Sequence, residues 1–370
     1  MVHVGIPPVP AHSSRPTTLE EATRKRESAL GAALEAGFDG LVVRSPPTVR
    51  WLLCGRGQPV DVCAADYTIL LLASRAYVLH MDIEESRVAR EERLEELGFE
   101  RVTFPWHAGP DETLAELLGG ARAGSDAELE PALASHRREL CEAERERYRA
   151  AGAAAADVFA ATLETLAPGR SELDVAGELA GRAQAQGLVP RVVLVAGAAR
   201  QRVHRHPLPT RASLGPHALL ALTAEREGLF VSLTRLVSFG APPVELARLV
   251  RACAEVDAGV LTASRPGARL GELLEVLSSA YEEHGFPGEW RRHHQGGLTG
   301  YKGREVFATP GEPTRLPPSC AVAWNPSIAG GAKSEDTALV AGDGVEIVTA
   351  TPGLPVLETG GPPRPGIAEL

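Results

Sequence analysis

The residues best suited to chemistry lie in one C-terminal stretch, residues 293–305, which reads HHQGGLTGYKGRE. Two adjacent imidazoles, those of His293 and His294, stand beside a carboxamide and four glycines. Histidine titrates near neutral pH and can move a proton, and glycine lets the backbone approach a ligand or adopt a positive φ. The stretch makes a poor core strand, so we expect a glycine-rich loop beside a functional site. A glycine-rich loop with solvated histidines is the plain alternative.

Two further histidines and a late carboxylate extend this set of candidates. His204 and His206 flank Arg205, and Glu335 lies in the segment KSEDT at residues 333–337. A carboxylate that contacts an imidazole tunes its pKa toward the working pH, so a His–Glu pair in a cleft can act as a general acid/base unit. The structural alternatives are solvated loop histidines and a buried carboxylate that braces a strand.

Length and composition bound the class of protein. The chain has 370 residues, which is enough for two domains that each bury a core. Its net charge of −10 and aromatic content of 5% argue against a nucleic-acid partner, because phosphates need a basic surface and bases need stacking platforms. We find no apolar run long enough to span a membrane. The five cysteines form no CxxC pair, which favours reduced thiols and a cytoplasmic location.

Strands and helices alternate over residues 18–137, a pattern typical of an α/β domain with a parallel or mixed sheet. A Pro-rich arm, residues 1–17, precedes this domain. The expected helices are residues 18–37 and 84–97, with a helix or turn at 48–54, and the expected strands are residues 40–43, 67–72, 76–80 and 101–104.

The remainder predicts a second, α+β domain over residues 138–352. It begins with a long helix that Pro168-Gly169 ends, and Ser171 then caps the next helix. Residues 353–370 form a Pro/Gly-rich tail that we expect to be loose. Later helices are expected at 243–262 and 270–284, and strands at 191–196, 218–222, 228–237, 320–324, 337–340 and 345–348.

Five short motifs, in this order, resemble those of the creatinase/prolidase/aminopeptidase P group, the M24 family. The resemblance covers roughly residues 18–350 and implies an α/β N-terminal domain followed by an α+β pita-bread domain of the catalytic type. It also implies a homodimer. The motifs are Pro168-Gly169-Arg170-Ser171-Glu172, Val195-Ala196-Gly197 with the segment HRHPLPT at 204–210, the hairpin at 227–235, HQGG at 294–297 and SEDT at 334–337.

The same resemblance places the two metal ions of the family on positions that have mostly lost their ligands. Its two Asp fall on Ala221 and Ser232, its His on His294, and its two Glu on Asn325 and Glu335. Divalent ions need several anionic ligands to offset dehydration. We therefore predict no metal and no other cofactor.

These positions favour a metal-independent hydrolase or lyase that breaks an amide- or amidine-like C–N bond of a small polar molecule or short peptide. Creatinase, by analogy, breaks such a bond on this fold without metal. His206 and His294 would exchange protons, Glu335 would orient one of them, and the backbone amides of Gly296 and Gly297 would face the oxyanion. The residues assigned to substrate binding are His204, Ser232, His293, Asn325, Tyr301 and Arg304.

Two other hypotheses stay open. The first is a pseudoenzyme that keeps the cleft to bind a peptide, a metabolite or a partner protein. The second is a residual Xaa-Pro-type metallopeptidase whose ligands have moved to Glu225, Glu227 and His293. Neither nucleic acid nor membrane is expected as a partner.

Overall fold

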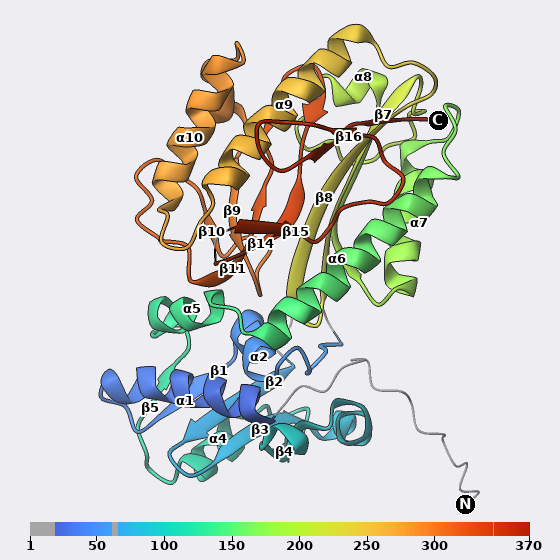
Figure 1. Ribbon diagram of the computed structural model, residues 1–370. Coiled ribbons are helices and arrows are strands. Elements are labelled where there is room, and N and C mark those ends of the chain that lie inside the picture. Colours follow the sequence, from blue (N-terminus) through green and yellow to red (C-terminus); the bar gives the residue numbers. More distant parts are fainter. Residues whose placement is uncertain (1–18, 61–65, 343) are drawn as a thin grey trace, which may run out of the picture. The chain divides into compact units, whose positions relative to one another are not determined.

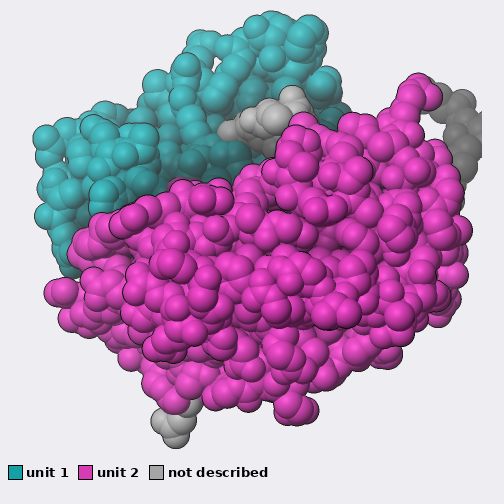
Figure 2. All heavy atoms as spheres, turned by 90° about the horizontal axis from the view of Figure 1, so that it is seen from above, with its two compact units in different colours: residues 1–137 teal, residues 138–370 magenta. Residues whose placement is uncertain are grey.

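The computed structural model describes residues 19–60, 66–342 and 344–370. The predicted arm at residues 1–17 and Cys63 lie outside these ranges. The chain divides into two compact units, residues 1–137 and 138–370, which Figure 2 colours teal and magenta. None of the helices in the described part of the chain has the length and apolar content that a membrane span requires.

The first unit is built on a mixed five-stranded sheet in the order β4-β3-β2-β1-β5. β1 runs parallel to β5 and antiparallel to β2, and β3 runs parallel to β4. This is the α/β arrangement that the alternation of strands and helices predicted. Its elements are α1 (Leu19–Glu35), β1 (Gly40–Val43), α2 (Pro46–Leu52), β2 (Tyr67–Leu72), β3 (Ala76–Met81), β4 (Glu100–Phe104), α4 (Asp111–Leu118), β5 (Ala123–Ser125) and α5 (Glu130–Arg138).

The single helix predicted at residues 84–97 is wrong. The segment is divided into three short helical pieces, α3 (Glu85–Arg87), a π-helical turn at Val88–Glu92 and a 3-10 turn at Leu94–Leu97, and Arg93 between the last two has a φ of 49°. The carboxylate of Glu92 points inward and accepts hydrogen bonds from the backbone N–H groups of Gly57 at 2.6 Å and Gln58 at 3.0 Å. A tertiary contact of this kind overrides the helix propensity of a Glu- and Arg-rich segment.

The second unit contains two large sheets with helices packed on each, together with the small two-stranded sheets β12-β13 and β16-β17 (Figure 1). One sheet has the order β18-β8-β7-β6 and packs against α6 and α7, and the other has the order β10-β9-β11-β14-β15 and packs against α9. The elements up to α10 are α6 (Glu142–Leu163), α7 (Glu172–Ala185), β6 (Val189–Gly197), α8 (Ala198–Gln201), β7 (His217–Arg226), β8 (Leu229–Ser238), α9 (Val244–Ala263) and α10 (Leu270–Glu283). The later elements are β9 (Gly296–Thr299), β10 (Val306–Phe307), β11 (Ser319–Trp324), β12 (Ser327–Ile328), β13 (Ala332–Lys333), β14 (Asp336–Ala341), β15 (Gly344–Ile347), β16 (Val356–Leu357), β17 (Arg364–Pro365) and β18 (Ile367–Glu369).

Local sequence signals account for the helices of this unit. The Ser171 side chain accepts a hydrogen bond from the backbone N–H of Asp174 at 3.1 Å, so the predicted cap of α7 is confirmed. In α9 the buried residues Leu249, Cys253, Val256 and Val260 recur at the three- and four-residue spacing of one helix face. They pack into the core between α9, α10 and the second sheet.

The two sheets of the second unit meet where β8 contacts the start of β14. The backbone N–H of Thr234 donates to the carbonyl oxygen of Glu335 at 3.0 Å, and the backbone N–H of Ser232 donates to Oγ1 of Thr337 at 2.7 Å. This seam brings residues far apart in the sequence to one place, and the candidate site forms beside it.

The C-terminal tail is ordered, which corrects our expectation of a loose segment. β18 pairs in parallel with β8, and the guanidinium of Arg364 is buried between Asp257 and Asp336. The Pro/Gly-rich composition signalled turns, but it carried no information about this sheet edge or these two buried carboxylates.

Candidate active site

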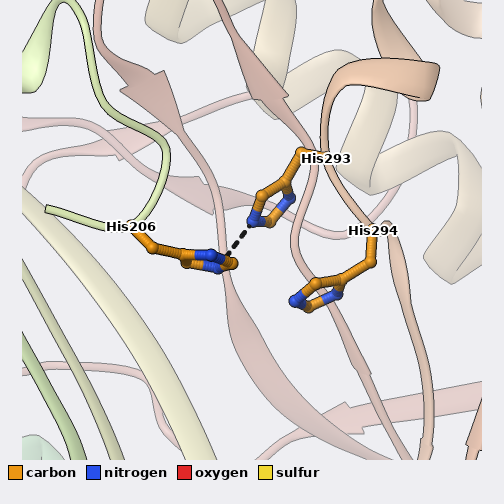
Figure 3. A group of neighbouring side chains, drawn as sticks. All are labelled: His206, His293 and His294. Atoms are coloured by element: carbon orange, nitrogen blue, oxygen red, sulfur yellow. Dashed lines mark hydrogen bonds between the residues drawn. The ribbon is translucent and has the colours of Figure 1, made fainter.

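Three imidazoles from two separate segments meet in the second unit (Figure 3). Nε2 of His206 lies 2.9 Å from Nε2 of His293, so one ring donates a hydrogen bond to the other. The rings of His293 and His294 stack with their centroids 4.5 Å apart, and His294 also packs edge-on against Phe307. One nitrogen of each imidazole lies within 4.8 Å of the other two. The structure thus brings together three of the four histidines that we assigned to the site.

A buried glutamine holds the segment that carries two of these rings. The Gln295 side chain donates to the carbonyl oxygens of Trp290 at 3.0 Å and His293 at 2.6 Å. It also accepts a hydrogen bond from the hydroxyl of Tyr281 at 3.1 Å. Because these bonds fix the backbone on both sides of His293, the imidazoles do not hang from a free loop.

The glycines after the histidines form a strand and not the loop that we predicted. Gly296 and Gly297 begin β9, between β10 and β11, with φ angles of 93° and 145°. A Cβ on Gly296 would lie 2.0 Å from the carbonyl oxygen of Ala323, and one on Gly297 would lie 2.3 Å from that of Val306. Only glycine fits here, because its neighbours approach so closely. The backbone is engaged in sheet pairing, so we withdraw the oxyanion role given to these amides.

Glu335 is buried beside the seam, and its partners differ from those we predicted. Its carboxylate accepts a hydrogen bond from Oγ1 of Thr234 at 2.8 Å, and it pairs with Lys333 at 3.1 Å and Arg304 at 3.1 Å. We expected Glu335 to orient an imidazole, whereas the imidazole contact of His206 is made by His293.

Sequence reasoning missed Lys333. Its ammonium group is buried in the same site as Glu335, with 5% of the side chain exposed. One signal was available, because residues two apart in an extended chain point to the same side, which places Lys333 on the face of Glu335.

The electrostatics keep the imidazoles neutral and the carboxylate charged at neutral pH. Burial, followed by the charge of Lys333, lowers the pKa of His293 to about 2. Burial and the charge of Arg304 lower the pKa of His294 to about 4, and burial and Lys333 lower the pKa of His206. Burial opposes ionisation of Glu335, but the charges of Lys333 and Arg304 outweigh it and lower its pKa to about 2. The site therefore offers neutral imidazole bases beside two cations.

Two other predicted residues line the seam. Oγ of Ser232 lies 2.9 Å from the hydroxyl of Thr223 and accepts a hydrogen bond from Arg304 at 3.4 Å, so Ser232 is part of the buried polar wall. Asn325 is buried at the end of β11, and its Oδ1 has no hydrogen-bond partner among the described residues. A buried acceptor of this kind calls for a water or a ligand group.

The structure does not bring Tyr301 and His204 to the imidazoles. The hydroxyl of Tyr301 donates to Glu144 of α6 at 2.8 Å, so this side chain braces the helix. His204 is exposed and lines a cavity with Arg205, and none of the three imidazoles is among the residues that line this cavity. We had assigned both residues to substrate binding next to His294.

The side chains at the metal positions do not fit a dinuclear metal site. Ala221 lies in β7 without any donor atom, and Ser232 and Asn325 bring no charge. Lys333 and Arg304 already neutralise Glu335. The three imidazoles resemble a ligand set for one transition-metal ion. However, the charge of Lys333 disfavours a proton on each of them, and it opposes a dication for the same reason.

The displaced ligand set suggested for a residual metallopeptidase is also not assembled. Glu225 pairs with Arg191 at the edge of β7, with Nε and Oε2 2.9 Å apart. Glu227 occupies the turn between β7 and β8, with a φ of 51°, and lies 4.0 Å from Arg147. Both carboxylates have arginine partners, and among the described residues no group of potential metal ligands combines either of them with His293.

Comparison with known proteins places this site in a family. A family model for metallopeptidase family M24 matches residues 146–342, which is more than half of the chain. The chain belongs to this family. The predicted fold class, an α/β domain followed by a pita-bread domain, is confirmed. A comparison with curated protein sequences gives no match.

Solved structures of the same fold cover nearly the whole chain. The Xaa-Pro dipeptidase from Bacillus anthracis matches with a TM-score of 0.74 at 20% identity, over 90% of this chain and 98% of that one. Dipeptidase PepE from Mycobacterium ulcerans matches with a TM-score of 0.73 at 19% identity, over 96% and 100%. The N-terminal domain of the FACT complex subunit SPT16 from Cicer arietinum also matches, with a TM-score of 0.65 at 12% identity, over 90% and 95%. At these identities the likeness describes the fold.

Proposed function

We propose that this M24 protein is a metal-independent hydrolase or lyase that acts on an amide- or amidine-like C–N bond of a small polar molecule or short peptide. One observation carries the proposal. Where the family fold would need anionic metal ligands, Lys333 and Arg304 hold Glu335, and neutral imidazoles lie within the field of these cations. Lys333, Arg304 and the neutral imidazoles would therefore take over the roles that metal ions have in a metallopeptidase.

The chemistry follows from the charge of each group. A water molecule would lose a proton to an unprotonated nitrogen of His294 while its oxygen attacks the carbon of the C–N bond. The ammonium of Lys333 and the guanidinium of Arg304 would face the negative charge that develops on the substrate. The protonated imidazole would then return the proton to the departing nitrogen, and the C–N bond would break.

His206 and His293 serve a different purpose in this scheme. Their 2.9 Å contact requires one ring to be the donor, so the pair fixes a tautomer in each ring. Because His293 stacks on His294, the pair also limits the orientations of His294. We assign positioning to His293 and a second proton-transfer role to His206.

A binding protein without turnover is the second candidate, and one observation favours it. A relative of the same fold is named as a subunit of a complex and not as a peptidase. The neutral histidines separate the two candidates, since a binding scaffold does not need them as bases.

The test is turnover by protein stripped of metal. The chain would be treated with EDTA, dialysed, and incubated with a panel of Xaa-Pro dipeptides, small amides and guanidino compounds, with amine or ammonia release as the readout. We expect turnover that EDTA leaves unchanged and that His294→Ala reduces at least about 100-fold, the usual scale for an acid/base group. His284→Ala, an exposed histidine at the end of α10, is the matched control.

Turnover that appears only with added Mn²⁺, Zn²⁺ or Co²⁺ would contradict metal independence. Turnover that His294→Ala leaves intact would contradict the acid/base assignment. No turnover with any compound would favour the binding protein. A homodimer, a cytoplasmic location and the absence of nucleic-acid and membrane partners stay predictions.

A further inference from the structure

A cavity of about 210 Å³ lies in the second unit. Its lining residues include His204 and four basic residues, Arg202, Arg205, Arg292 and Lys333. None of the described residues that line it is an Asp or Glu. A concave surface of one charge sign focuses the field on ions of the opposite sign.

The carboxylates behind this wall do not balance its charge. Arg205 and Arg292 share Glu289, with Arg292 at 3.6 Å. Lys333 shares Glu335 with Arg304. Arg202 forms no ion pair with a described residue. Two carboxylates, Glu289 and Glu335, are therefore set against five cations, which are Arg202, Arg205, Arg292, Arg304 and Lys333. This local excess belongs to a chain whose net charge is −10.

The cavity and the imidazole site are built from the same three segments. Arg205 lines the cavity, and the next residue is His206. Arg292 lines the cavity, and the next residue is His293. Lys333 lines the cavity and also contacts Glu335 at 3.1 Å. A ligand group held in the cavity would therefore place its remaining atoms beside the imidazoles.

We propose that this cavity is an oxyanion subsite that binds a carboxylate or phosphate group of the molecule whose C–N bond is broken at the imidazoles. Guanidinium groups suit both groups because their N–H donors match paired oxygens. The anion-binding half of the inference stands on the cavity alone, and the substrate half rests on the proposed function.

The test measures anion binding without turnover. Isothermal titration of the full chain would use inorganic phosphate in one arm and succinate in the other, at matched ionic strength, because salt screens such contacts. The variant Arg202→Gln/Arg292→Gln removes two cavity cations. Arg291→Gln is the control, because Arg291 is exposed, lies next in sequence to Arg292, stacks over Trp290 and does not line the cavity.

We expect at least one of the two anions to bind at one site per chain. The double variant should raise its dissociation constant about tenfold, as expected for the loss of charged hydrogen bonds, and Arg291→Gln should leave it unchanged. Whichever anion binds more tightly identifies the ligand group as phosphate or carboxylate. The inference is overturned if neither anion binds, or if the control weakens binding as much as the double variant does.

One further variant separates this inference from the proposed function. His294→Ala should abolish turnover and keep anion binding. If anions bind but no C–N compound is turned over, the proposed function fails and the subsite stands. If compounds are turned over but the double variant binds and processes anionic ones as well as the wild type does, the subsite fails and the proposed function stands.

Discussion

Glu335 and Asp336 are neighbours in the chain, and both are buried carboxylates held between two cationic side chains, yet their surroundings differ. Asp336 pairs with Arg235 at 2.7 Å and Arg364 at 2.7 Å, and it accepts a hydrogen bond from Thr349 at 2.5 Å. Both guanidinium groups are almost fully buried. Glu335 pairs with Lys333 and Arg304, but Lys333 also lines a cavity.

The difference separates a structural cluster from a reactive one. Around Asp336 the charged groups pair with one another inside the core, and through Arg364 this cluster holds the C-terminal tail onto the core. Around Glu335, partial burial and then the charges of Lys333 and Arg304 lower the pKa values of His206 and His294, and both of these histidines keep an exposed surface. Buried ion pairs are poor evidence of stability on their own. Exposure to solvent therefore distinguishes the two clusters, because only groups that a substrate can reach can take part in chemistry.

The largest effect is expected from Asp336→Asn. The substitution leaves the buried guanidinium groups of Arg235 and Arg364 without full compensation, and removal of one partner from a buried ion pair costs about 3–5 kcal/mol. We expect the free energy of unfolding, measured in denaturant, to fall by this amount. Asp157→Asn, at an exposed position of α6, should change it by less than about 0.5 kcal/mol. A variant as stable as the wild type would remove the structural role of Asp336.

Glu335→Gln should reduce turnover strongly and the free energy of unfolding only slightly, in contrast to Asp336→Asn. Because Lys333 lines a cavity, water or an anion there can partly compensate its charge, so we expect the free energy of unfolding to fall by only about 1–2 kcal/mol. Loss of the carboxylate leaves both cations unopposed, which lowers the pKa values of His293 and His294 further. Turnover on the substrate found for the wild type should fall at least about tenfold. Equal losses of stability in Glu335→Gln and Asp336→Asn would break the distinction.

The smallest expected effect is on the pH dependence of the free energy of unfolding, and it tests the imidazoles near Glu335. The pKa of His293 is about 2 in the folded protein, against 6.5 for a free imidazole. Between these values the unfolded state binds a proton that the folded state does not, so stability is highest above pH 6.5 and falls as pH is lowered. One such group contributes a slope of up to about 1.4 kcal/mol per pH unit.

Measurement between pH 6.5 and 4.5 isolates the imidazole contribution, because Glu335, with a pKa of about 2, begins to destabilise the fold only below its ordinary value of 4.5. His293→Asn should flatten the slope of unfolding free energy against pH in this window. His284→Asn, at an exposed position, should leave the slope unchanged. A slope that stays the same in His293→Asn would show that His293 is protonated in the folded state.

Much of the framework follows from the sequence because its signals are local. Short apolar runs predicted β1 and β2 with their observed bounds, and Ser171 predicted the start of α7. Five ordered motifs indicated the family. The mismatch at Ala221, Ser232 and Asn325 predicted that a dinuclear metal site does not fit, since a ligand position without an anionic donor can be read from residue type alone.

Tertiary structure decided what depends on distant partners. Gly296 and Gly297 looked like a loop, but the close approach of β10 and β11 makes them a strand that no other residue could form. The tail looked loose, but Arg364 finds two buried carboxylates and β18 finds the edge of β8. Lys333 received no role from the sequence, but in the structure its buried ammonium pairs with Glu335. The charge that a residue meets depends on which segments fold against it, and residue type alone does not specify that.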